Sequence, residues 1–257
     1  MTTLHILFTA DMHNKLTKEK AVIIRELKKK FSPDVLLLDA GDAIASGNLG
    51  ANSKEPIFEL MDIAGYDAMA MGNRETHPTQ SAMHKKLGGA KLPILAANLR
   101  ARQDKRPPRC VNEYLEFAVG DESEDDVPVI AVFGLCPVIT APDSFWAKVT
   151  DYVFDDPLKT GPGLAHKLSY DADLVIALTH IGYDRDIQLA QCEDIDLVLG
   201  GHTHKQVMPA EKHGHAWFAS VEPYAVNIAH LTINYTPGEG IDSIVSEIIP
   251  LGSPEKK

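Results

Sequence analysis

Cysteine is scarce in this chain, with three in 257 residues. Cys110, Cys136 and Cys192 are far apart in the sequence, their number is odd, and none belongs to a C-x-x-C pair. A disulfide scaffold usually shows an even set of cysteines, and a zinc ribbon needs paired ones. The sequence therefore predicts neither a disulfide framework nor a cysteine-based zinc site.

Positive charge is also in short supply. The chain has 25 Lys and Arg against 36 Asp and Glu, which gives a formal net charge of −11. Proteins hold nucleic acid mainly through arrays of Lys and Arg that displace the counterions of the phosphate backbone. We therefore expect no nucleic-acid surface. An anionic substrate would need local positive charge, which bound metal ions could supply.

Long apolar runs are absent as well. No stretch approaches the roughly 18 consecutive apolar residues that a membrane-spanning helix requires. The first apolar run, residues 4–8, is too short for a signal peptide, and no basic segment precedes it. We expect a cytoplasmic protein that does not associate with a membrane, although a secreted chain whose signal had been removed would look similar.

What is present is typical of a globular protein with a substantial core: 44% of the residues are hydrophobic and 24% are charged. Length alone is compatible with one large domain or two small ones. Short apolar runs alternate with helical segments, as in an α/β layered domain. Expected strands are residues 4–10, 35–38, 68–71, 94–96, 127–133, 174–178 and 197–199, followed by closing strands at 216–219, 225–235 and 241–249. Expected helices are residues 17–31, 55–64, 80–87, 163–168 and 185–192.

Two charged segments are expected to be loops. The acidic segment 121–126 lies between two strand-like runs and is predicted to be a hairpin loop. It is a poor calcium site, because a calcium loop needs spaced carboxylates and a turn glycine. The basic segment 100–109 contains Pro107 and Pro108 and is predicted to be exposed.

Five short polar signatures each follow an apolar run, at the point where a strand would end. They are Asp11-Met12-His13, Gly41-Asp42, Gly72-Asn73-Arg74-Glu75, Thr179-His180 and Gly200-Gly201-His202-Thr203-His204. In open α/β sheets the ligand crevice lies beyond the carboxyl ends of the strands. The five signatures could therefore converge on one site although they are far apart in the sequence.

Taken singly, most of these signatures are weak, because Asp-x-His and Gly-Asp occur by chance and a lone histidine is usually structural. The tract 200–204 is more specific, since its two histidines follow glycines that let the backbone turn tightly. Together the signatures offer imidazoles, carboxylates and one amide but no thiolate, which suits Mn, Fe, Zn, Co or Ni. A carboxylate can bridge two ions, so a paired-ion centre is chemically reasonable.

With these signatures in this order, the sequence resembles the calcineurin-like metallophosphoesterase superfamily, and specifically the catalytic domain of its 5'-nucleotidase branch. The resemblance covers nearly the whole chain. The segments that carry it are 35–42, 65–73, 93–98, 177–180 and 194–202. It implies an α/β fold of four layers, an αββα sandwich in which two mixed β-sheets pack face to face, formed by residues 1–257 as a single domain.

The resemblance also implies two divalent metal ions, with manganese the ion expected first. By position, Asp11, His13 and His204 would bind the first ion, Asn73, His180 and His202 the second, and Asp42 would bridge them. Two ions about 3.5 to 4 Å apart can activate a bridging hydroxide and stabilise an in-line transition state. The expected function is hydrolysis of a small phosphomonoester, for example a nucleotide, by direct attack of that hydroxide.

One departure from the family concerns the catalytic acid. The residue after the motif's Asn is usually a His that helps the leaving group depart, paired with an Asp three positions further on, but here those positions hold Arg74 and His77. Arg does not release a proton at ordinary pH, although its planar guanidinium can hold a phosphate oxygen. We expect Arg74 to clamp the phosphoryl group and His77, or a metal-bound water, to protonate the leaving oxygen. The alternative is that Arg74 merely pairs with a neighbouring acid and His77 is a surface residue.

A second departure is that the chain ends shortly after its last expected strands. We therefore expect no C-terminal domain of the kind that stacks the nucleobase in full-length 5'-nucleotidases, and the substrate and oligomeric state stay open. A phosphodiesterase with the same centre is the nearest alternative. A catalytically impaired protein that binds metal or a phosphate ligand is the alternative of another class; Arg74 favours it and the complete ligand set opposes it.

Overall fold

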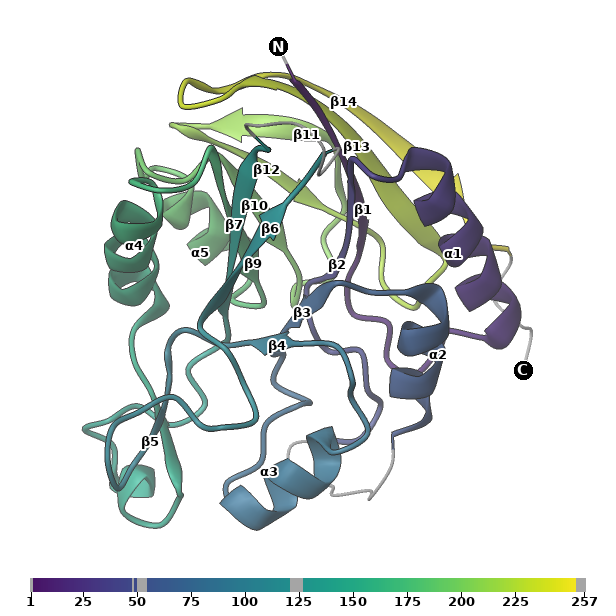
Figure 1. The fold of residues 1–257 in the computed structure, drawn as a ribbon. Coiled ribbons are helices and arrows are strands. Elements are labelled where there is room, and N and C mark those ends of the chain that lie inside the picture. The colour runs from purple at the N-terminus through teal and green to yellow at the C-terminus, as the bar shows by residue number, and fades with distance from the viewer. Residues whose placement is uncertain (1, 48, 50–54, 121–126, 253–257) are drawn as a thin grey trace.

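The computed structural model describes residues 2–47, 49, 55–120 and 127–252. Two six-stranded sheets pack face to face, and helices cover their outer faces (Figure 1). This is the four-layer αββα arrangement with two mixed sheets, and it confirms the expected fold.

The first sheet has the strand order β14-β13-β1-β2-β3-β4. These strands are β1 (Thr2–Thr9), β2 (Val35–Asp39), β3 (Ala68–Ala70), β4 (Ile94–Leu95), β13 (Asn227–Thr236) and β14 (Gly240–Pro250). The first four run parallel, so their carboxyl ends meet at one end of the sheet. The last two are antiparallel and extend the sheet beyond β1.

The second sheet has the order β11-β12-β10-β9-β7-β6. Its strands are β6 (Tyr114–Ala118), β7 (Val129–Leu135), β9 (Leu174–Thr179), β10 (Leu197–Gly200), β11 (Val207–His213) and β12 (Ala216–Ser220). The four central strands are parallel, and the two edge strands, β6 and β11, are antiparallel to their neighbours.

The core between the sheets is apolar and continuous. Ile6 and Phe8 of β1 belong to the same buried cluster as Ile176 of β9 and Leu199 of β10. Leu7, which lies between Ile6 and Phe8 in the sequence, belongs instead to the cluster under the helices of the first sheet. Strands buried on both faces have no polar face, which is why their sequences are apolar without alternation.

The described residues form five α-helices, and the first two and the last two of these make up the outer layers. The five helices are α1 (Lys18–Phe31), α2 (Pro56–Ala64), α3 (Gln80–Leu87), α4 (Pro157–Leu168) and α5 (Tyr183–Leu189). Ile24 and Phe58 bury the first two against the first sheet, and Ala165 and Leu189 bury the last two against the second. In Figure 1 these pairs lie on the right and left of the sheets. None of the described helices combines the length and apolarity that crossing a membrane requires.

The helix α4 begins at Pro157 rather than at residue 163, where the sequence pattern placed it. Proline suits the first turn of a helix, because its missing N–H would have no partner there. The Asp156 side chain caps the helix by accepting a hydrogen bond from the backbone N of Leu158 at 3.2 Å. Gly161 lets α4 lie close to α5, since an added Cβ would be 2.9 Å from a Leu189 methyl.

Several small elements were not predicted. Besides the edge strand β11, β5 (Leu99–Ala101) pairs antiparallel with β8 (Tyr152–Phe154), and a short 3-10 helix spans Phe145–Lys148. The start of the basic segment 100–109 is therefore a strand rather than a loop. The acidic segment 121–126 lies outside the described residues, and the strands that flank it, β6 and β7, pair antiparallel.

Candidate metal centre

The seven predicted ligands follow parallel strands of both sheets. Asp11 and His13 follow β1, Asp42 follows β2, Asn73 follows β3, His180 follows β9, and His202 and His204 follow β10. The face-to-face packing of the sheets brings the carboxyl ends of these strands together. The structure thus joins polar segments that are almost two hundred residues apart.

One group of ligand atoms comes from Asp11, His13 and His204, and these atoms lie within 4.8 Å of one another. The two Nε2 atoms are 3.1 Å apart. Oδ1 of Asp11 lies 3.3 Å from Nε2 of His204 and 3.8 Å from Nε2 of His13. Two imidazole nitrogens and a carboxylate oxygen around one point suit a divalent transition-metal ion.

A second group comes from Asp11, Asp42 and His180. Nε2 of His180 lies 3.5 Å from Oδ1 of Asp42 and 3.8 Å from Oδ1 of Asp11. Nδ1 of the same ring is 2.7 Å from the carbonyl oxygen of Ala40, so Nδ1 donates the hydrogen bond and Nε2 faces the carboxylates. The carboxylate common to the two groups is that of Asp11, and the bridging role of Asp42 stays a prediction.

His202 and Asn73 lie at the margin of these groups. The backbone N of His202 donates to Oδ2 of Asp11 at 2.9 Å, and its ring is 5.0 Å from that of His180. The Asn73 side chain is half-buried, and the residue that follows it, Arg74, contacts Asp42 through its backbone N at 2.8 Å. The His202 ring therefore stands beside the second group, whereas Asn73 adjoins that group through the backbone of the next residue.

Four buried atoms of the predicted ligands have no hydrogen-bond partner among the described residues: Oδ1 of Asp11, Nδ1 of His13, Oδ1 of Asn73 and Nε2 of His180. Buried polar atoms in native proteins are almost always paired. All four are atoms of types that can donate a lone pair, and they come from both of the ions' predicted ligand sets. The residues present therefore fit divalent ions.

The backbone at the site is strained. Five of the predicted ligands have a positive φ: Asp11 (51°), His13 (45°), Asp42 (53°), His202 (78°) and His204 (54°). Residues other than glycine rarely adopt this left-handed conformation, and strain of this kind concentrates at functional sites. Backbone hydrogen bonds hold it in place, such as that from the N of Asp11 to the carbonyl oxygen of Gly41 at 2.9 Å.

Glu75 stabilises the loops that carry predicted ligands after strands β2 and β3, a role that was not predicted from the sequence. Its buried carboxylate accepts from the backbone N of Gly72 at 2.8 Å, of Asp42 at 3.0 Å and of Ile44 at 3.2 Å. Burial, followed by the charge of Asp42, raises the pKa of Glu75 to about 7. Gly72 is needed at this junction, because an added Cβ would lie 2.3 Å from the N of Asp42. The sequence feature that could have indicated this role is an acidic residue, Glu75, three positions after Gly72.

Burial and charged neighbours together shift the pKa values of two histidines at the site in opposite directions. Burial acts to lower the pKa of His180, but its contact with Asp42 and the charges of Asp42 and Asp11 outweigh burial and raise that pKa to about 9. Burial, followed by the charge of Arg74, lowers the pKa of His13. At neutral pH the His13 imidazole is therefore ready to coordinate an ion, whereas His180 must first release a proton.

Arg74 reaches the site through Asp42. Its backbone N donates to Oδ1 of Asp42 at 2.8 Å, and its Nε lies 3.4 Å from Oδ2. A terminal nitrogen of the guanidinium donates to the carbonyl oxygen of Ala45 at 2.7 Å, and the side chain is 35% exposed. Arg74 thus pairs with a neighbouring acid, as the alternative supposed, while part of its guanidinium stays open to solvent.

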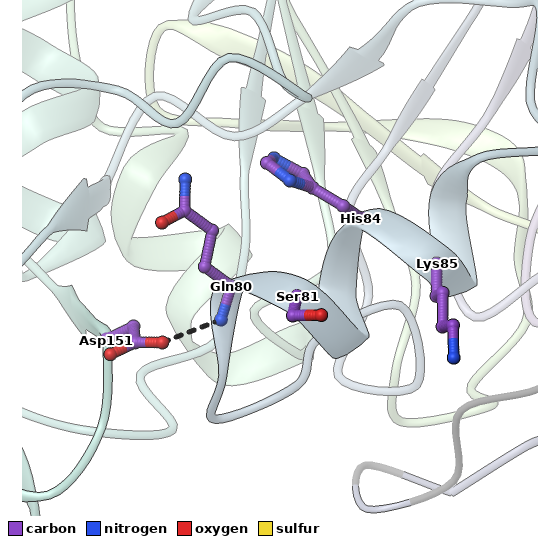
Figure 2. Close-up of a pocket in the computed structure, with 5 residues that line it drawn as sticks. All are labelled: Gln80, Ser81, His84, Lys85 and Asp151. Atoms are coloured by element: carbon purple, nitrogen blue, oxygen red, sulfur yellow. Dashed lines mark hydrogen bonds between the residues drawn. The ribbon is translucent and has the colours of Figure 1, made fainter.

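His77 makes its contacts within the turn that precedes α3. Its Nδ1 accepts from the backbone N of Thr79 at 3.1 Å, and within the described chain no hydrogen bond joins it to either group. Figure 2 shows a surface hollow at the start of α3, where Asp151 accepts from the backbone N of Gln80 at 2.8 Å. Gln80, Ser81, His84, Lys85 and Asp151 line this hollow, and none of them is a predicted ligand.

Comparison with known proteins gives a family and relatives. The model of the calcineurin-like phosphoesterases matches residues 4–206. The chain is 30% identical over 236 residues to the trifunctional nucleotide phosphoesterase protein YfkN of Bacillus subtilis, which covers 79% of this chain and 16% of that one. It is 31% identical over 182 residues to the 5'-nucleotidase of Rattus norvegicus, which covers 68% of this chain and 30% of that one. The chain thus spans less than a third of either relative.

Solved structures share the fold. The 5'-nucleotidase precursor of Thermus thermophilus has a TM-score of 0.78 at 20% identity, covering 97% of this chain and 54% of its own. The calcineurin-like phosphoesterase YfkN of Bacillus subtilis has a TM-score of 0.73 at 20% identity, covering 97% and 91%. Because the family model matches most of the sequence, the chain belongs to the calcineurin-like phosphoesterases, a family of metal-dependent phosphoric ester hydrolases, and its relatives place it in the 5'-nucleotidase branch.

Proposed function

We propose that this chain hydrolyses a small phosphomonoester with two divalent ions bound between the carboxyl ends of the two sheets. The observation that carries the proposal is the pair of ligand groups that share Asp11. The unpaired buried ligand atoms support it. Nucleotides are the first substrates to test, because the relatives are named a nucleotide phosphoesterase and a 5'-nucleotidase.

Two such ions, for which we propose manganese, would supply an activated water and positive charge near the phosphoryl oxygens. The chain's own residues set the geometry of the donors. The carbonyl oxygen of Ala40 orients the His180 ring, and the backbone N of Arg74 orients the Asp42 carboxylate. Outer contacts of this kind commonly control metal affinity, because they fix the direction of each ligand.

Arg74 is proposed to hold a phosphoryl oxygen. A guanidinium has five N–H donors in one plane, and here one is used on Ala45 while Nε faces Asp42. The remaining donors belong to a side chain that is 35% exposed, so an anionic ligand can reach them. Planar donors of this kind suit the oxygens of a phosphate group.

His77 is proposed to protonate the leaving oxygen. Because its Nδ1 accepts a hydrogen bond from the backbone N of Thr79, the proton of the neutral ring is on Nε2. That atom would donate to the ester oxygen, which requires an approach of about 2.6 to 3.2 Å in the complex with substrate.

The test of the proposal is metal analysis of the Mn²⁺-loaded chain, combined with rates on nucleoside monophosphates, alkyl phosphates and the matching diesters. We expect about two ions per chain and faster hydrolysis of monoesters than of diesters. Faster hydrolysis of diesters would make the chain a phosphodiesterase. Two bound ions without hydrolysis of any ester would make it a binding protein, and failure to bind metal would contradict the proposal entirely.

A further inference from the structure

An aromatic side chain stands beside the first ligand group. The Tyr224 ring lies 5.4 Å from the ring of His13 and 5.6 Å from that of His204, measured between centroids. These are the two imidazoles whose Nε2 atoms approach to 3.1 Å. Tyr224 is 43% exposed, so its ring borders the open side of the site.

The backbone holds Tyr224 in a strained conformation. Its φ is 69° and that of Ala225 is 50°, two consecutive left-handed residues of which neither is glycine. The backbone N of Tyr224 donates to the carbonyl oxygen of Asp11 at 2.9 Å, and Nζ of the buried Lys20 donates to the carbonyl oxygen of Ala225 at 2.8 Å. Strain that the surroundings enforce in this way is a feature of ligand sites.

Packing does not explain the position of this ring. Within the described residues, Tyr224 is a member of none of the three apolar core clusters, whereas the next residue, Ala225, belongs to one of them. The Tyr224 hydroxyl also has no hydrogen-bond partner in the described chain, although its ring contacts both histidines. The part of the Tyr224 side chain that is available to a ligand is therefore the face of its ring.

We propose that Tyr224 forms the wall of the substrate site that contacts the alcohol part of the phosphoester, and that it favours an aryl or pentose ring over a small alkyl group. The inference rests on the proposed function. A phosphoryl group held near His13 and His204 would have its ester substituent one or two bonds away, within reach of the Tyr224 ring. Aromatic faces attract such rings through offset or edge contacts.

Binding of two non-hydrolysable ligands tests the inference. Calorimetry on the Mn²⁺-loaded full chain should show tighter binding of phenylphosphonate than of methylphosphonate, by about two- to tenfold for one aromatic contact. Tyr224→Ala should remove this preference, and Tyr224→Phe should keep it because the hydroxyl is not used. Binding of methylphosphonate and of Mn²⁺ should be unchanged in both variants. Tyr170→Ala is the control, since this tyrosine is 75% exposed and contacts His166 of α4 instead.

Hydrolysis gives a second measurement. Tyr224→Ala should raise KM for phenyl phosphate by a similar factor and leave kcat nearly unchanged. Equal losses for both phosphonates together with weaker Mn²⁺ binding would show that the ring only supports His13 and His204, and an unchanged preference would likewise overturn the inference. If no ester is hydrolysed but the preference depends on Tyr224, the proposed function fails alone. If esters are hydrolysed without such a preference, this inference fails alone.

Discussion

The two sheets supply different chemistry to the same site. The loops of the first sheet bring both carboxylates, the amide and His13, whereas those of the second bring only imidazoles. The predicted ligands that follow the second sheet are His180, His202 and His204. This division explains why the pKa of His180 is raised against the effect of burial: its ring faces Asp42 and Asp11 from across the interface. Neither half offers a complete ligand group, so the candidate centre depends on the packing of the two sheets.

The buried acidic residues next to the two sets of predicted ligands also differ, in how fully their carboxylates are hydrogen-bonded. On the first sheet, Glu75 accepts from three backbone N–H groups. Asp186, behind the second sheet, accepts at 2.6 Å from the hydroxyl of Thr179, and its other oxygen has no partner among the described residues. Burial raises the pKa of Glu75 to about 7 and that of Asp186 to about 8. The carboxylate of Glu75, beside the first sheet, therefore has more hydrogen-bond partners than the carboxylate of Asp186, beside the second.

The largest effect should come from Asp11, which both ligand groups share. Asp11→Asn removes the shared charge, so we expect the metal content to fall below one ion and the rate to drop by about 10³-fold, or roughly 4 kcal/mol of barrier. Metal analysis and rates on one monoester measure this. His204→Gln should affect the first ion more than the second, and Asp171→Asn, at an exposed acid, should change neither. Retention of two ions by Asp11→Asn would show that the groups do not share this ligand.

A large but selective effect should come from His77. If its Nε2 protonates the leaving oxygen, His77→Ala should slow hydrolysis of an alkyl phosphate by about 10²-fold or more. Hydrolysis of nitrophenyl phosphate should hardly change, since that leaving group departs without a proton. His84→Ala, on the exposed face of α3 drawn in Figure 2, is the control. An unchanged rate on the alkyl ester would remove His77 from the mechanism.

Arg74 should affect binding of the phosphoryl group. A hydrogen bond from a charged donor is worth about 2 kcal/mol, so Arg74→Ala should weaken inhibition by inorganic phosphate about thirtyfold. Arg74→Lys should be intermediate, because it keeps the charge but not the planar donors. Arg185→Ala removes an exposed arginine that lies 3.9 Å from Asp156 and serves as the control. If phosphate inhibits all variants equally, pairing with Asp42 is the whole role of Arg74.

The smallest effect, on the pH dependence of stability, should come from Asp186. Because its folded-state pKa is raised to about 8 from an ordinary value of 3.8, it contributes stability at low pH that is lost as pH rises through about 8. Asp186→Asn cannot ionise, so in the metal-free chain the variant should gain stability relative to the parent between pH 5 and pH 9. Urea unfolding across this range measures the difference. A difference that does not vary with pH would mean that Asp186 is ionised throughout.

Much of the fold could be predicted because its buried strands are apolar throughout. The strands on which the site depends were predicted to within a few residues, since they are covered on both faces. The edge strand β11 was not, because most of its residues are exposed or half-buried and it lies on one rim of the sheet. The first turns of α4 were not predicted because proline residues such as Pro157 and Pro162 usually end or interrupt a helix.

For the site, residue types could be predicted but individual contacts could not. Short motifs at strand ends, together with the family resemblance that they carry, predicted the seven candidate ligands. Glu75 was missed because its partners are backbone N–H groups, which no sequence pattern displays. His77 lies with its Nδ1 against Thr79, a direction set by the local turn before α3.

The sequence by itself determined the order of the strands' polar ends and the kinds of donor that each end carries, because these follow from local runs of apolar and polar residues. Only the tertiary structure decided which atoms meet. The Nδ1 of His180 finds the carbonyl oxygen of Ala40, and the Tyr224 ring lies against His13, in each case across residues remote in the sequence. Such distances depend on how the two sheets pack and on the left-handed backbone of the loops between them, which local sequence does not specify.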